Sequence, residues 1–308
     1  MITVKTTRLC LLFLGIAILA PHVHAQNSAS HGTQVVLLGT GNPRPDPERS
    51  GPAVAIVVNG SSYLVDMGAG IVRRASAAAQ QKGIAALGVK NLKIVFVTHL
   101  HSDHTIGYPD LIFTPAVMRR PGALEVYGPR GIKAMTDNIL AAYSADIGIR
   151  LHGLEHGNAE AYVVNVHEIE PGVVYRDANV TVKAFLVRHG SWPQAFGYRF
   201  ETADRTIVIS GDTAPSQSVI DACNGCDILL HEVYSVAGVG KGSGQSKEYF
   251  ASFHTSTYEL AELAAKARPK LLVLYHQMPL ASTFEVLLKE IQDRYHGKVV
   301  NGNDLDIF

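Results

Sequence analysis

The sequence predicts a mixed α/β fold formed by one large domain. Two observations support this: short β-branched apolar segments recur along the chain, and segments with a helical period separate several of them. The chain has 308 residues with an apolar content of 47%, which is sufficient for a full-sized core. Because no short-period repeat or low-complexity linker divides it, we expect one domain of about 280 residues.

The predicted strands are short and almost continuously apolar, as in the run Ile94-Val95-Phe96-Val97. Segments of this kind suit strands that are covered on both faces of a sheet. We expect strands at residues 34–38, 54–58, 63–66, 92–97, 124–127, 180–187, 206–210, 228–232 and 271–275.

Four segments between these strands have helical periodicity, at residues 71–81, 131–145, 256–267 and 282–295. The last two follow Ser or Thr residues, which helices prefer as N-terminal caps. The Gly- and Ser-rich stretch 236–246 predicts one mobile loop rather than a domain boundary. Its place just before His254 makes it a candidate lid.

The first 25 residues have the features of a secretory signal peptide. Lys5 and Arg8 precede a short apolar run at residues 9–20, and Val23-His24-Ala25 provides a small-x-small cleavage site. The apolar run is too short to span a bilayer comfortably, and no lipobox cysteine follows it. We therefore expect a periplasmic or secreted protein without a membrane anchor, consisting of one domain over residues 26–308.

The charge balance argues against a nucleic-acid partner. The full chain has 27 basic and 27 acidic residues, and loss of Lys5 and Arg8 with the signal leaves 25 against 27, a net charge of −2. Proteins that bind nucleic acid usually carry a basic surface instead. A small-molecule substrate is therefore expected.

Two cysteines remain after the signal, in the sequence Cys223-Asn224-Gly225-Cys226. A CxxC pair binds zinc or performs redox chemistry only with a second pair or in a thioredoxin-like context, and neither is present. We expect a local disulfide in an oxidising compartment, with two free thiols as the alternative.

Histidines and aspartates follow several of the predicted strands. The motif THLHSDH comes directly after residues 92–97 and supplies His99, His101, Asp103 and His104. Three further side chains follow the strands at 180–187, 206–210 and 271–275; they are His189, Asp212 and His276. Since the carboxyl ends of parallel strands meet at one edge of an α/β sheet, these side chains are expected to converge.

Imidazoles and carboxylates in this pattern are typical ligands of zinc and similar divalent ions. His99 and His101 can bind one ion, while the adjacent Asp103 and His104 turn towards a second. The carboxylate of Asp212 has two oxygens and can bridge both ions. The expected result is a site with two divalent metal ions about 3.5–4 Å apart and a hydroxide between them.

The HxHxDH motif with a later His, Asp and His resembles the signature of the metallo-β-lactamase superfamily. The resemblance covers essentially the whole chain after the signal, and it implies an αββα sandwich with a dinuclear zinc site at one edge. It also implies that His189 joins the first ion's ligands and His276 the second's. Asp66, in YLVDMGAG, matches an early aspartate that steadies the metal-bearing loop without binding metal.

Further motifs resemble the tRNase Z and arylsulfatase-like branch of this superfamily. They are LLGTGNPRPDPERSGP, LLHEVY and FHTST. The resemblance implies that Glu232 orients His254, and that the pair delivers a proton to the leaving oxygen. A purely structural role for the His231-Glu232 pair is the alternative. Asp103 is expected to hold or accept the proton of the attacking water while it binds metal.

These features together predict an exported dinuclear zinc hydrolase that cleaves aryl sulfate or phosphodiester bonds. A tRNase Z-like endoribonuclease that processes RNA 3′ ends is the first alternative. Export and the absence of a long basic arm in the sequence argue against it. A β-lactam or lactone hydrolase on the same scaffold is the second. The resemblance also implies a homodimer, and Trp192, Phe196, Tyr234 and Phe253 are candidates for contact with an apolar leaving group.

Overall fold

The structure is a computed structural model, and it describes residues 32–241 and 247–308, which belong to one compact unit. The predicted signal peptide at residues 1–25 lies outside these residues. No helix in the described part of the chain is long and apolar enough to cross a membrane.

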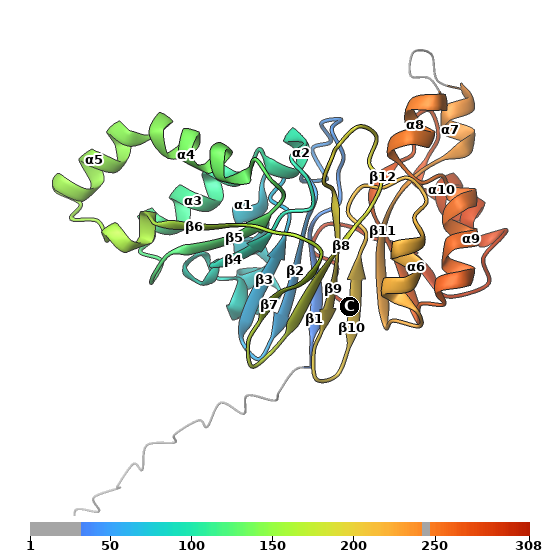
Figure 1. Ribbon diagram of the computed structural model, residues 1–308, viewed down its shortest axis with the longest axis horizontal. Coiled ribbons are helices and arrows are strands. Elements are labelled where there is room, and N and C mark those ends of the chain that lie inside the picture. The colour runs from blue at the N-terminus through green and yellow to red at the C-terminus, as the bar shows by residue number, and fades with distance from the viewer. Residues whose placement is uncertain (1–31, 242–246) are drawn as a thin grey trace, which may run out of the picture. The chain divides into compact units, whose positions relative to one another are not determined.

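Two β-sheets form the centre of the described unit (Figure 1). The first sheet contains, in spatial order, β1 (Gln34–Gly39), β2 (Ala53–Val58), β3 (Ser61–Val65), β4 (Ile94–Phe96), β5 (Leu124–Gly128) and β6 (Val164–Glu168). The second contains β13 (Val299–Asn301), β12 (Leu271–Met278), β11 (Ile228–Tyr234), β10 (Thr206–Ile209), β9 (Phe196–Glu201), β8 (Thr181–Leu186) and β7 (Gly172–Arg176). Strands β6 and β7 are short and mostly exposed, and they were not predicted because they lack the continuous apolar character used to find most of the others. Strands β9 and β13 were not predicted either.

Helices cover the outer face of each sheet (Figure 1). The first half of the chain supplies α1 (Ile71–Gln81), α2 (Ser102–Thr105), α3 (Tyr108–Val117), α4 (Ile132–Ala142) and α5 (Ser144–His152), with short 3-10 turns at Ala85–Leu87, Val89–Asn91 and Ala159–Tyr162. The second half supplies α6 (Gln217–Cys223), α7 (Val236–Lys241), α8 (Lys247–Phe253), α9 (Thr257–Ala267) and α10 (Phe284–Gln292). The expected loop at 236–246 is thus helical at Val236–Lys241, because Glu290 of α10 accepts the backbone N–H groups of Val236 (3.2 Å) and Ala237 (2.8 Å) at the start of α7.

Three apolar clusters show that the layers follow the order helix, sheet, sheet, helix. One cluster joins α1 and α3 to the outer face of the first sheet, and another joins α6, α9 and α10 to the outer face of the second. The middle cluster lies between the sheets and includes Val35, Ile56, Phe96, Tyr198 and Ile207, all with no exposed surface. The αββα sandwich expected from the sequence is therefore confirmed.

Strand direction brings the predicted ligands to one edge. Strands β3, β4, β5 and β6 run parallel to one another, as do β10, β11, β12 and β13. Strand β9 runs antiparallel to both β8 and β10, so β8 runs in the direction of β10. Parallel strands present their carboxyl ends at a common edge, where binding sites of α/β proteins usually form.

The disulfide expected between Cys223 and Cys226 is present at the end of α6, where both residues are buried. It closes a loop of a few residues and lies in the apolar cluster beneath α9 and α10. The pair therefore belongs to the core rather than to a metal or redox site.

Candidate metal centre

All seven predicted ligands meet at the edge where β4, β8, β10 and β12 end or bend. His99 and His101 lie on the loop after β4, and Asp103 and His104 lie on α2. His189 follows β8, Asp212 follows β10, and His276 lies within β12. Between β10 and Asp212, Gly211 adopts a positive φ of 62°, and a Cβ there would lie 2.7 Å from the carbonyl oxygen of Phe196. Glycine at this position lets the chain turn Asp212 into the site.

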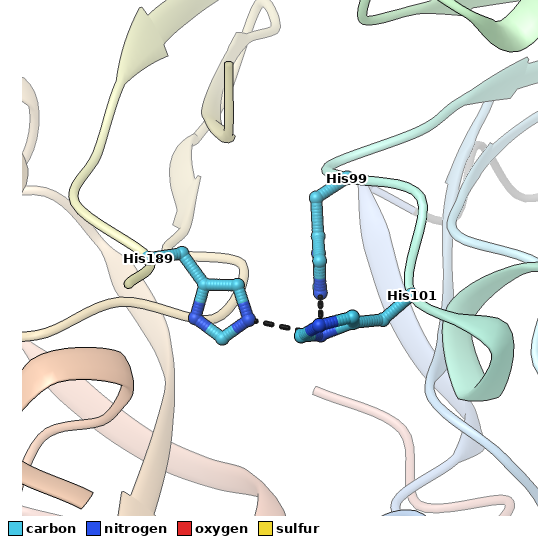
Figure 2. A group of neighbouring side chains, drawn as sticks. All are labelled: His99, His101 and His189. Carbon is cyan, nitrogen blue, oxygen red and sulfur yellow. Dashed lines mark hydrogen bonds between the residues drawn. The ribbon is translucent and has the colours of Figure 1, made fainter. Parts of the chain in front are cut away.

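Three imidazoles form one part of the site. Nδ1 of His101 lies 3.0 Å from Nε2 of His99 and 3.0 Å from Nε2 of His189. Figure 2 shows the three rings turned towards one another, with a nitrogen of His101 facing both of the other rings. Two chain segments far apart in sequence thus present three nitrogens to a common point.

Two carboxylates and two further imidazoles form the other part. Nε2 of His276 lies 3.1 Å from Oδ2 of Asp103, and Nε2 of His104 lies 3.6 Å from the same oxygen. Asp212 faces both imidazoles: its Oδ1 lies 3.3 Å from His104 Nε2, and its Oδ2 lies 3.3 Å from His276 Nε2. Asp212 also groups with His99 and His104 within 4.8 Å, so it lies between the two parts of the site.

His276 reaches the site by a local irregularity that sequence patterns do not show. The sequence predicts it just after the end of a strand, whereas it lies inside β12 with a positive φ of 44°. The pairing of β11 and β12 shifts here, so that two residues of β11 span the same distance as three of β12. This bulge rotates His276 out of the normal alternation and towards Asp103 and Asp212.

Asp66 supports the cluster from behind, as the resemblance implies. Its Oδ2 accepts a hydrogen bond of 2.8 Å from Nδ1 of His104, and its Oδ1 accepts the backbone N–H of Thr98 at 2.7 Å. With its Nδ1 proton directed to Asp66, His104 presents Nε2 to the site. Ligand imidazoles in metal sites are commonly fixed in this way.

Burial sets the protonation of the first three imidazoles. Desolvation holds the pKa of His99 well below its usual range, lowers that of His101, and lowers that of His189 to about 4. These rings are neutral near pH 7 and carry lone pairs for a metal ion. For His104, burial opposes protonation, but the carboxylates of Asp212 and Asp66 outweigh it and raise the pKa.

The chemistry of the cluster fits divalent cations. His104 Nε2 and Asp212 Oδ1 are fully buried and have no hydrogen-bond partner among the described residues, although buried polar atoms are normally paired. The nitrogen separations of 3.0 Å in the first part approach the roughly 3.3 Å expected between nitrogens around a tetrahedral zinc ion. Seven imidazole and carboxylate ligands agree with the preference of zinc and similar ions.

Glu232 and His254 lie side by side at the back of the site. Nδ1 of His254 is 3.4 Å from Oε2 of Glu232 and 3.9 Å from Oδ2 of Asp212. Glu232 is held by the backbone N–H of Thr255, 2.8 Å from its Oε1. Burial and the charge of Asp212 raise the pKa of Glu232 well above its usual range, and burial lowers that of His254 to about 4. His254 also lies within ligand distance of His189 and Asp212, which the sequence motifs do not indicate.

A small pocket of about 90 Å³ opens onto these groups. One wall is formed by four of the predicted metal ligands, which are His101, Asp103, Asp212 and His276. Another is formed by Tyr249, Phe250, Met278 and Leu280. Of the candidate aromatic contacts, Phe196 is fully buried between the sheets and Tyr234 packs on Phe250 and Met278, so both belong to the core. Phe253 and Trp192 lie beside the first imidazoles, with ring centroids 5.1 Å from His189 and 5.1 Å from His101, respectively.

Sequence reasoning missed Tyr249 and Arg44, which also line the pocket. Tyr249 lies four residues before Phe253 on α8, and this spacing places both on one face of a helix. That pattern was available in the sequence, but no helix was predicted over residues 247–253. For Arg44, only the folded position of its loop places it at the site.

Comparison with known proteins gives three consistent findings. A family model described as a β-lactamase superfamily domain matches residues 62–277. Ribonuclease Z from Mycobacterium marinum is 32% identical over 278 residues, covering 88% of this chain and 96% of the relative. Ribonuclease Z from Mycobacterium sp. strain KMS is 35% identical over 249 residues, covering 80% and 84%.

Solved structures agree with the fold. The human short form of tRNase Z superposes with a TM-score of 0.64 and 25% identity, covering 89% of this chain and 98% of the other. The metallo-β-lactamase fold protein YhfI from Bacillus subtilis superposes with a TM-score of 0.68 and 17% identity, covering 90% and 98%.

Proposed function

Because the chain belongs to the tRNase Z branch of the metallo-β-lactamase superfamily, we propose that this hydrolase cleaves phosphodiester bonds with two bound divalent metal ions. The observation that carries the proposal is the convergence of seven imidazole and carboxylate side chains, two of them with buried atoms that form no hydrogen bond with the described residues. The first ion would be held by His99, His101 and His189, and the second by Asp103, His104 and His276. Asp212 would contact both.

Two divalent ions held by these residues, zinc in our proposal, would lower the pKa of a water molecule towards neutrality and would offset the negative charge that develops on a phosphoryl group. The protein's own groups direct the remaining chemistry. Asp103 is the least buried of the carboxylates in the cluster and lines the pocket, so it can accept a proton from the attacking water. Asp66 and Thr98 hold the metal-bearing loop and do not line the pocket.

The leaving oxygen requires a proton, and His254 is positioned to supply it. His254 lines the pocket, while Glu232 lies behind its Nδ1 and directs the ring. Negative charge brought by a phosphodiester favours the protonated imidazole, opposing the effect of burial on its pKa. A positioned acid of this kind contributes most when the leaving group is a poor one.

The names of the relatives support one of the two candidate substrate classes. Those described above carry the name ribonuclease Z, which supports the phosphodiester alternative more strongly than the aryl sulfate reaction. A small aryl ester remains the second candidate, because one wall of the pocket is formed by Tyr249, Phe250, Met278 and Leu280. Export to the periplasm and a homodimer remain proposals that fractionation and solution mass measurements can test.

A substrate panel with metal quantification tests the proposal. The purified protein is loaded with zinc and assayed against bis(4-nitrophenyl) phosphate, 4-nitrophenyl sulfate and a tRNA precursor with a 3′ trailer. We expect phosphodiester cleavage that follows metal content and falls more than about 100-fold in Asp212→Ala, beyond the usual effect of removing a residue that only supports a ligand. Cleavage of the sulfate alone would favour the second candidate. Failure to cleave either phosphodiester would refute the proposal.

A further inference from the structure

A groove of about 530 Å³ adjoins the smaller catalytic pocket. The two hollows share Asn42, Pro43, Arg44 and Asp103, so a ligand that reaches Asp103 can continue into the groove. The lining of the groove also includes Ile106, which is 64% exposed and offers an apolar surface. We call this hollow the Arg44 groove. Its size exceeds what the ester group alone requires.

Arg44 lines both the pocket and the groove, and its guanidinium has no partner in the part of the chain that the structure describes. Only its backbone N–H has a recorded partner, Oδ1 of Asn42 at 3.0 Å, and the side chain makes no ion pair or hydrogen bond with the described residues. Arg49 also lines the groove, but its guanidinium donates to Thr40 (2.7 Å) and to Gly302 (3.0 Å). Arg44 is therefore the basic group in the described groove that is available to a ligand.

The loop that carries Arg44 is held at both ends. Asn42 donates its side-chain N–H to the carbonyl oxygen of Gln277 at 2.7 Å, next to the ligand His276. At the other end, Gly41 N–H donates to Ser50 at 2.8 Å, and Ser50 N–H donates to Asp304 at 2.8 Å. Pro43, Pro45 and Pro47 restrict the backbone between these points. The base of Arg44 is thus fixed relative to the metal ligands.

The two acidic side chains that line the described groove form no ion pair with Arg44. Asp46 lines the same groove, but its Oδ1 accepts the backbone N–H of Glu48 at 2.9 Å. Asp103 is directed to His276 at 3.1 Å. A guanidinium that is free beside a site for phosphodiesters is suited to a second phosphate, which it can bind through two parallel hydrogen bonds.

We propose that Arg44 and the Arg44 groove form a subsite for a second phosphate, carried by the nucleotide next to the ester that is cleaved. This inference rests on the proposed phosphodiesterase function and defines its substrate more narrowly: the protein selects nucleotide substrates with at least two phosphates. Ile106 supports the sugar or base of that nucleotide, while the scissile phosphate occupies the metal-ligating pocket.

Binding of small nucleotides tests the subsite without relying on turnover. Calorimetric titration of the zinc-loaded protein compares thymidine 3′,5′-bisphosphate with thymidine 5′-phosphate and thymidine 3′-phosphate. Since a charge-assisted pair adds roughly one order of magnitude in affinity, we expect about tenfold tighter binding of the bisphosphate than of either monophosphate. In Arg44→Ala this ratio falls to about two or less by the same reasoning, and Arg44→Lys retains part of it.

Arg176→Ala is the matched control, because Arg176 is an exposed arginine on β7 that lines neither hollow. It should keep the wild-type ratio. An unchanged ratio in Arg44→Ala, or equal affinity of the wild type for all three nucleotides, overturns the subsite. Hydrolysis of bis(4-nitrophenyl) phosphate is measured in parallel. Hydrolysis without an Arg44-dependent preference refutes only the subsite, and the preference without hydrolysis of any phosphodiester refutes only the proposed function.

Discussion

At the scale of single residues, one buried carboxylate prepares a neighbouring imidazole for metal binding. Asp66 accepts the Nδ1 proton of His104 at 2.8 Å and so directs Nε2 towards Asp212. We expect Asp66→Asn to reduce metal affinity by about 10–100-fold, because an amide fixes this tautomer less strongly. Competition with a chromogenic chelator measures the change. Asp177→Asn, at a distant carboxylate that accepts Tyr63 OH at 2.5 Å, is the control and should bind metal normally.

His254 is expected to act on the leaving group. If it donates a proton to the leaving oxygen, His254→Ala should slow cleavage of thymidylyl-thymidine by about 10²–10⁴-fold. Cleavage of thymidine 5′-(4-nitrophenyl phosphate) should fall by less than about tenfold, because nitrophenolate leaves without protonation. Steady-state kcat for the two substrates provides the comparison. Equal losses on both substrates would assign His254 a structural role.

Trp192 is the only tryptophan of the chain, and it reports on His101. Its indole N–H donates to Nε2 of His101 at 2.8 Å. An ion bound at Nδ1 leaves the ring proton on Nε2, so that two donors would face each other and the hydrogen bond must break. We expect tryptophan emission to change when zinc is added and to recover when a chelator removes it. Full metal loading without a change in emission would contradict this prediction.

At the scale of elements, a capping box stabilises the start of α9, two residues after His254. Ser256 accepts the backbone N–H of Glu259 at 3.3 Å, and Glu259 in turn accepts the backbone N–H of Ser256 at 3.0 Å. Replacing a capping Ser by Ala usually costs about 1 kcal/mol, and we expect this loss of unfolding free energy in Ser256→Ala. Urea denaturation measures it. Ser76→Ala, on the opposite side of the sandwich within α1, should change stability less.

The strands and helices also show which elements can be predicted from sequence patterns and which cannot. Strands with continuous apolar character, such as β2 and β11, were predicted because nearly every side chain in them is buried. Strands β6 and β7 were missed because exposed residues dominate them. Helix α7 was missed because glycine and serine favour a loop locally, whereas the carboxylate of Glu290, distant in sequence, binds its first N–H groups.

At the scale of the whole molecule, buried histidines couple stability to pH. His231 is fully buried, its Nδ1 lies 2.6 Å from the carbonyl oxygen of Glu232, and burial lowers its pKa to about 4. The unfolded chain has a histidine pKa of about 6.5 and takes up this proton first as the pH falls. His231 therefore reduces stability progressively between pH 6.5 and about 4.

The variant His231→Leu should remove this contribution. Over that pH interval, its unfolding free energy should depend on pH less steeply than that of the wild type, by about 1.4 kcal/mol per pH unit. Denaturant titrations at several pH values, on metal-free protein, compare the two slopes. Parallel curves would show that His231 does not titrate in this way.

The sequence by itself predicted a mixed α/β fold and the seven residues of the candidate site, because apolar runs indicate buried strands and imidazoles and carboxylates are typical ligands of divalent ions. The αββα order was expected only from the resemblance to a known superfamily. Tertiary structure decided what depends on contacts between distant segments. The bulge that turns His276 inward results from the pairing of β11 with β12. The Arg44 groove exists because the loop after β1 folds against α2 and β12. Local patterns record which side chains are buried, but the direction in which each one points depends on neighbours that only the folded chain brings together.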